Sequence, residues 1–256
     1  MLTTVAVSGY RSLRDVVVGL GPLTVVTGPN GSGKSSLYRA LRLLADCGAG
    51  RVVGSLAAEG GLPSALWAGP ETTGGARRGH GTQSTVRKGP RAVRLGVADD
   101  DGFGYLVDLG LPPADERSAF DLDPEVKREV VFSGPVARPA AVLVDRDGPL
   151  VRARGDAGWA HLTQRLGATD SMLTELVDPE RAPELLAVRG QLRGWRLYDG
   201  FRVDRDSPAR QARIGTRTPV LDPDGGSLAA ACRPSPRSAT PRRWPGRWRT
   251  PSTARR

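Results

Sequence analysis

Residues 23–44 read LTVVTGPNGSGKSSLYRALRLL, and this stretch decides the fold. The short apolar run at 23–27, bounded by glycine, is typical of a buried β-strand. Beyond a glycine-rich turn, apolar residues recur at helical spacing from Leu37 to Leu44, and the small residues at 47–50 predict the end of that helix. Strand, glycine loop and helix in this order predict an α/β fold with a phosphate-binding loop.

The loop fits the pattern G-x-x-x-x-G-K-[ST] with Gly28, Gly33, Lys34 and Ser35. Glycines allow successive backbone N–H groups to converge on phosphate oxygens, and the positive end of the following helix points at the same anion. In this pattern the lysine reaches the β- and γ-phosphates and the hydroxyl binds Mg²⁺, so Ser35 is the predicted metal ligand. The predicted ATP-binding residues are Gly28, Pro29, Asn30, Gly31, Ser32, Gly33, Lys34, Ser35 and Ser36.

Alternating apolar and polar residues predict strands on both sides of the motif. Residues 2–7 and 16–18 are expected to form a hairpin or meander before the central strand 23–27. Two later hairpins are expected. They join 92–97 with 104–109, and 140–144 with 150–154, the second through an Asp-Gly turn.

One further helix and one polar loop complete the expected organisation. Residues 179–198 are predicted to be helical, and Leu185, Leu186, Leu192 and Trp195 are its expected buried face. Residues 76–91 are polar, basic and glycine-rich, which indicates a surface loop; contact with nucleic acid is the alternative.

The sequences of the motif and of its flanking segments resemble those of a known family. VSGYRSL at 7–13, LTVVT at 23–27 and GPNGSGKSSL at 28–37 are similar to the start of the RecF/SMC/Old-nuclease-like group of ABC-type ATPases, often termed AAA family ATPases in bacteria. The resemblance spans about residues 1–230 and is less specific after the phosphate-binding loop at 28–35. It is carried there by GGLPSALWAG at 60–69, DSMLTE at 170–175, WRLY at 195–198 and GTRTPVL at 215–221.

This resemblance implies a P-loop NTPase fold with an N-terminal β-meander, a P-loop strand and helix, and a β-rich insertion. It implies ATP hydrolysis at a homodimer interface and a role in DNA repair or phage defence. It also places Arg11 and Ser12 near the nucleotide.

The residues that would hydrolyse ATP are not found. The resemblance implies a signature motif and a Walker B strand that ends in Asp and Glu. Residues 140–145 imitate such a strand, but Arg146 stands where the glutamate belongs, so we interpret Asp145 as a hairpin residue. No catalytic residue is assigned. The C-terminal half of the ATPase core is expected to be missing.

The net charge of +10 is concentrated at the C-terminus. Residues 232–256 contain eight arginines, five prolines and no acid; the other 29 basic residues nearly balance the 27 acidic ones. A disordered basic arm that binds DNA through Trp244 and Trp248 is one interpretation. We favour another, out-of-frame translation after a frameshift near residue 230. The expected organisation is then an ATPase-type domain at 1–230 with a variable loop at 71–91, and an out-of-frame tail at 231–256.

Other classes are less consistent with the sequence. No apolar run reaches the roughly 20 residues of a membrane span, and the N-terminus lacks a signal-peptide layout, so a cytoplasmic protein without membrane contact is expected. Two distant cysteines and two histidines predict neither a disulfide framework nor a metal cluster. A small-molecule kinase, a GTPase and a basic-tailed nucleic-acid-binding protein remain alternatives.

Overall fold

The structure is a computed structural model that describes residues 1–69, 92–113, 122–216, 218 and 220–232. The chain divides into two compact units, Met1–Trp195 and Arg196–Arg256. The loop predicted at 71–91 and residues 233–256 of the predicted tail lie outside the described residues, so the predictions about them stay predictions.

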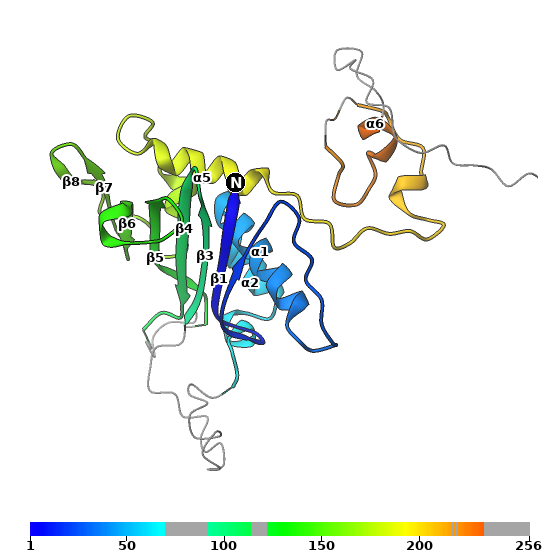
Figure 1. Cartoon of the computed structure of the whole chain (residues 1–256), viewed down its shortest axis with the longest axis horizontal. Coiled ribbons are helices and arrows are strands. Elements are labelled where there is room, and N and C mark those ends of the chain that lie inside the picture. The colour runs from blue at the N-terminus through cyan, green and yellow to red at the C-terminus, as the bar shows by residue number, and fades with distance from the viewer. Residues whose placement is uncertain (70–91, 114–121, 217, 219, 233–256) are drawn as a thin grey trace, which may run out of the picture. The chain divides into compact units, whose positions relative to one another are not determined.

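The described part of the first unit contains one eight-stranded antiparallel sheet with the order β2-β1-β3-β4-β5-β6-β7-β8. β1 lies towards one end of the sheet and β8 at the other (Figure 1). The strands are β1 (Leu2–Tyr10), β2 (Leu13–Gly19), β3 (Ala92–Asp99), β4 (Phe103–Gly110), β5 (Glu125–Ser133), β6 (Val142–Asp147), β7 (Leu150–Gly155) and β8 (Gly158–Thr163). The three expected hairpins are confirmed; β5 and β8 are strands that the sequence patterns did not predict.

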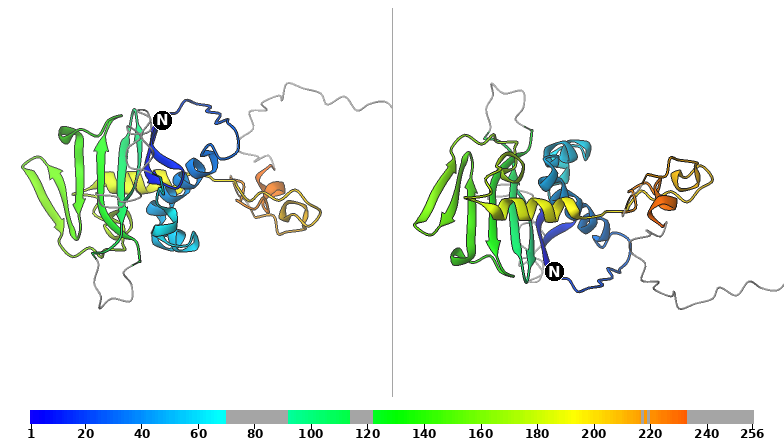
Figure 2. Two further views of the ribbon diagram at one scale, coloured as in Figure 1. Left: turned by 90° about the horizontal axis from the view of Figure 1, so that it is seen from below. Right: turned by 90° about the horizontal axis from the view of Figure 1, so that it is seen from above.

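The helices of this unit cover one face of the sheet. α1 (Lys34–Ala49) packs against β1 and β3, and α5 (Pro183–Gly194) packs against β4, β5 and β6. Figure 2 shows α5 lying across the strands, in front of them in one view and behind them in the other. The described residues of the unit also form three shorter helices and one 3-10 helix: α2 (Val52–Ala58), α3 (Leu62–Ala65), α4 (Met172–Glu175) and η2 (Pro139–Ala141).

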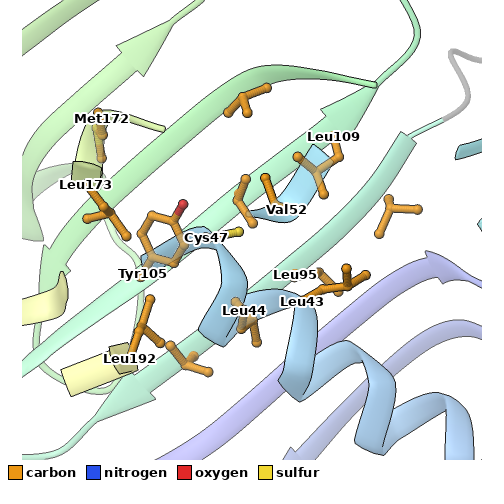
Figure 3. Close-up of a cluster of buried hydrophobic side chains, with 14 of the residues drawn as sticks. Leu43, Leu44, Cys47, Val52, Leu95, Tyr105, Leu109, Met172, Leu173 and Leu192 are labelled. Carbon is orange, nitrogen blue, oxygen red and sulfur yellow. The ribbon is translucent and has the colours of Figure 1, made fainter. Parts of the chain in front are cut away.

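The core forms between these helices and the inward side chains of the strands. Leu44 and Cys47 of α1, Tyr105 of β4 and Leu192 of α5 are fully buried together (Figure 3). A side-chain carbon on Gly48 would lie 2.8 Å from Cβ of Leu192, so this glycine permits the close approach of α1 and α5. Burial raises the pKa of the Cys47 thiol, which keeps the thiol protonated.

α5 is shorter than predicted. Its first turn contains Pro183, where a missing N–H costs nothing, and it ends at Gly194 rather than at 198. Leu185 and Leu192 are buried as expected, but Val188 occupies the third buried position. Leu186 and Trp195 are only partly buried.

A buried charge network joins the sheet to α4. Arg146 donates to Glu129 over 2.7 Å, and both side chains are fully buried. Glu129 also accepts from Tyr105 Oη at 2.5 Å, from Ser171 Oγ at 2.5 Å and from the Met172 N–H at 2.7 Å. The remaining Arg146 donors reach the backbone oxygens of Gly148, Gly167 and Asp170. Because every charged atom has a partner, the pair can be buried.

The prediction of a central strand at 23–27 is wrong for the described residues. This segment forms no strand, and Leu23 and Val25 are 85% and 73% exposed. An apolar strand of a parallel sheet needs neighbours on both sides and cover on both faces, and none of the described strands pairs with it. The observed sheet is therefore the antiparallel, meander part of the expected α/β architecture.

The second unit is built mainly of turns in its described residues. It contains η3 (Pro208–Arg210) and α6 (Leu228–Ala231). Ser207 is buried, donates to the Arg202 carbonyl oxygen at 2.6 Å and caps η3. Tyr198 Oη donates to the Leu221 carbonyl oxygen at 2.9 Å. The predicted domain boundary at 230 stays a prediction. In the parts of both units that are described, no helix is long and apolar enough to cross a membrane.

Candidate functional site

The glycine-rich loop lies between the exposed segment 23–27 and the start of α1. Gly28, Gly31 and Gly33 have φ values of 151°, 82° and 98°, a region that side chains with a Cβ rarely adopt. At Gly33 an added Cβ would also meet Leu13 Cδ2 at 2.9 Å and Ser12 Oγ at 3.3 Å. Glycine is therefore required at Gly33 by both backbone conformation and space.

The N-terminus of α1 is open to an anion. The helix begins at Lys34, and no side chain caps its N-terminal N–H groups. The first intrahelical bond runs from the Leu37 N–H to the Gly33 carbonyl oxygen at 2.9 Å, so the N–H groups before it have no acceptor within the helix. Free N–H groups and the positive end of the helix dipole form an anion site.

Lys34 folds back across the loop. Its Nζ donates to the carbonyl oxygens of Gly28 at 2.7 Å and of Pro29 at 2.8 Å. The ammonium group thus lies over the loop, where a phosphate group would replace these carbonyls as its partner. The next residue, Ser35, is exposed and its hydroxyl can reach solvent, as a Mg²⁺ ligand requires.

The turn between β1 and β2 reaches this loop through Ser12. Ser12 Oγ and Ser36 Oγ are 2.8 Å apart and share a hydrogen bond. Arg11, by contrast, has a φ of 48° and donates to Glu59 Oε2 through Nη2 at 2.7 Å and Nε at 3.0 Å. The structure therefore brings Ser12 to the loop and holds Arg11 against Glu59. Glu59 lies 48 residues from Arg11, and no sequence signal pairs the two.

The segment that imitates a Walker B strand is part of the antiparallel hairpin β6–β7, as predicted. Asp145 pairs with Arg128 at 3.2 Å and with Arg152 at 2.8 Å. Arg146 is held in the buried pair with Glu129. Neither residue is available to a nucleotide.

Residues 23–229 match the model of the family described as "AAA domain, putative AbiEii toxin, Type IV TA system". The chain belongs to this AAA domain family. The match spans the glycine loop, α1, the sheet from β3 to β8 and most of the described second unit. The sequence-based assignment to AAA-type ATPases of the RecF/Old kind is thereby confirmed.

A stretch of this AAA domain chain is also similar to the OLD nuclease of Thermus scotoductus (strain ATCC 700910 / SA-01). The two are 46% identical over 44 residues, which is 17% of this chain and 8% of the nuclease. The matched stretch thus spans less than a tenth of the relative's length.

Proposed function

We propose that this AAA domain binds ATP with Mg²⁺ through residues 28–36. The observation that carries the proposal is the combination of left-handed glycines, an uncapped helix N-terminus and Lys34 over the same loop. Lys34 would exchange its bonds to Gly28 and Pro29 for bonds to phosphate oxygens. Ser35 would hold the Mg²⁺, which neutralises phosphate charge when bound.

ATP hydrolysis requires residues beyond those described. Asp145 and Arg146, at the position that imitates Walker B, are engaged in ion pairs. The family resemblance implies that such groups and a signature motif would complete the site at a homodimer interface. We therefore assign binding to this chain and hydrolysis to a complete core.

We propose that a frameshift near residue 230 explains the change of composition there. The family match ends at residue 229, close to where the composition changes to arginine and proline. The exposed segment 23–27 is further support, because its apolar side chains need the strands of a complete core. Intact signature and Walker B motifs in another frame downstream would agree with this proposal, and their absence would contradict it.

The related proteins suggest the setting in which ATP is used. One matched description names a toxin of a toxin–antitoxin system, and the partial relative is a nuclease. We infer a role in phage defence or DNA maintenance for the complete ATPase.

Binding and turnover can be measured together on the full chain. One assay measures retention of radiolabelled ATP with and without Mg²⁺. A second assay measures phosphate release from the same sample, which separates binding from hydrolysis. Mg²⁺-dependent retention without release above background is the expected result. Failure to retain ATP would contradict the proposal.

A further inference from the structure

The face of the sheet opposite α1 and α5 carries a hollow of about 500 Å³. In β4, Tyr105 and Val107 point into the core beneath the helices, so the alternate residues Leu106 and Asp108 point to the other face. Leu106 and Asp108 line the hollow, together with residues of β5, β6, β7 and β8. The hollow is thus lined by β4 to β8, whereas the glycine loop precedes α1, which packs against β1 and β3 on the other face.

Arginines dominate the polar lining of this hollow, which we call the arginine groove and define by Arg128, Arg138, Arg152, Arg154 and Trp159. Among the described residues, the acids that line it are Asp108 and Asp145.

One aspartate holds two of these arginines. Asp145 is 7% exposed and accepts from Arg128 Nη2 at 3.2 Å and Arg152 Nη2 at 2.8 Å. A single carboxylate cannot neutralise two guanidinium groups, and both arginines remain largely exposed. The groove therefore keeps an excess of positive charge at its surface, which attracts anions.

Trp159 lies among the same arginines. The guanidinium carbons of Arg152 and Arg154 lie 4.8 Å and 4.9 Å from the centroid of its ring. Arg154 is further fixed by donating to the carbonyl oxygens of Ala140 at 2.8 Å and Pro139 at 3.1 Å. Trp159 remains 39% exposed, so flat groups in solution can reach this stack of ring and guanidinium groups.

We propose that the arginine groove binds single-stranded nucleic acid. Bases would stack on Trp159 or on the guanidinium planes beside it, and phosphates would pair with Arg128 and Arg138. A duplex hides the faces of its bases, and the carboxylates of an acidic peptide offer no ring to stack on the indole. A single strand offers both the charge and the aromatic surface that this groove matches.

The inference does not depend on ATP binding. The groove is built from β4 to β8 and η2, and none of residues 28–36 of the glycine loop lines it. A substitution that abolishes ATP binding should leave nucleic-acid binding intact, and the reverse should also hold.

The test uses the full chain and a 15-nucleotide oligothymidylate that contains one 2-aminopurine, whose fluorescence falls on stacking. Trp159→Ala should weaken binding by about tenfold or more and remove the quenching, because stacking on an aromatic side chain contributes strongly to each base bound. Trp159→Phe, which keeps a ring, should retain most of both. Arg138→Ala should reduce the slope of log affinity against log salt by about 0.7, the value for one phosphate contact on a single strand.

Two controls test whether binding is specific to the arginine groove and to a single strand. Arg39→Ala removes an exposed arginine from α1, on the other side of the sheet, and should leave the affinity and the salt slope unchanged. A duplex of the same length should bind more weakly than the single strand. Unchanged binding by Trp159→Ala and Arg138→Ala, as expected if residues 233–256 carry all of the affinity, would overturn the proposal. Equal binding of the duplex would overturn its single-strand assignment.

Discussion

The ammonium nitrogen of Lys34 lies 2.7 Å from the carbonyl oxygen of Gly28, six residues earlier in the chain. This bond closes the glycine loop with the group that is expected to bind phosphate. The bond helps to shape the loop, although the segment before it forms no strand in the described residues.

Gly33→Ala should damage the loop more than the fold. The added methyl would meet Leu13 Cδ2 at 2.9 Å in a conformation with φ of 98°, and such strain costs on the order of 1–2 kcal/mol. We expect ATP affinity to fall at least tenfold. Gly54→Ala is the matched control, because Gly54 lies inside α2 with open space around it and should become slightly more stable. Equal ATP affinity in the two variants would contradict the geometry of the loop.

Substitutions in the exposed segment 23–27 should have little effect on stability. Leu23→Ala should change the free energy of unfolding by less than about 0.5 kcal/mol, since Leu23 is in solvent. Leu44→Ala, the same substitution in the core, should cost about 2–5 kcal/mol. Urea unfolding of both variants measures the difference. A large cost at Leu23 would mean that the segment is buried in solution.

The N-terminal meander, the P-loop helix and both later hairpins could be predicted, because alternation and an Asp-Gly turn are local signals. β5 was missed: its Glu129 is charged but buried, and its partner Arg146 lies 17 residues away in the next strand. The predicted strand at 23–27 failed for a related reason. Its apolar composition is a strand signal, but strand pairing needs neighbours that the described residues do not supply.

The residues of the candidate site are neighbours in the sequence, so the motif alone brings them together, and their binding of ATP stays a prediction. Residues 28–36 follow a contiguous motif, and Ser12 reaches them as the resemblance implied. Arg11 was placed near the nucleotide by the same resemblance, but its contact with Glu59 is a long-range pairing that has no local pattern.

Removing one partner of the buried Arg146–Glu129 ion pair should strongly destabilise the first unit. Arg146→Met leaves the Glu129 charge buried without its cation, which costs about 3–5 kcal/mol in comparable sites. Arg94→Met removes the exposed partner of Asp108 and should cost less than about 1 kcal/mol. Chemical denaturation monitored by circular dichroism compares the two. A cost below 1 kcal/mol for Arg146→Met would show that the network is not buried.

Alkaline pH should weaken the fold through Tyr10. Burial is the main cause that raises the pKa of this phenol to about 12, from an ordinary value of 10.0. Well below pH 10 the phenol is protonated in both the folded and the unfolded chain. Between pH 10 and about 12 the unfolded chain ionises first, so stability is lost as the pH rises.

Tyr10→Phe tests this dependence, because it removes the ionisable group and keeps the ring. The variant should lose less stability than the parent chain between pH 9 and pH 11, measured by urea unfolding. Tyr198→Phe, in the second unit, should keep the alkaline loss of the parent. Identical pH profiles for Tyr10→Phe and the parent would contradict the burial of Tyr10.

The most direct test of the account is isothermal titration of the full chain with ATP and Mg²⁺. Lys34→Ala is compared with Lys127→Ala, which removes a lysine from β5, away from the loop. The account predicts saturable binding by the parent and by Lys127→Ala, and a loss of at least tenfold in affinity for Lys34→Ala. Unchanged binding by Lys34→Ala would contradict the assignment of the ATP site.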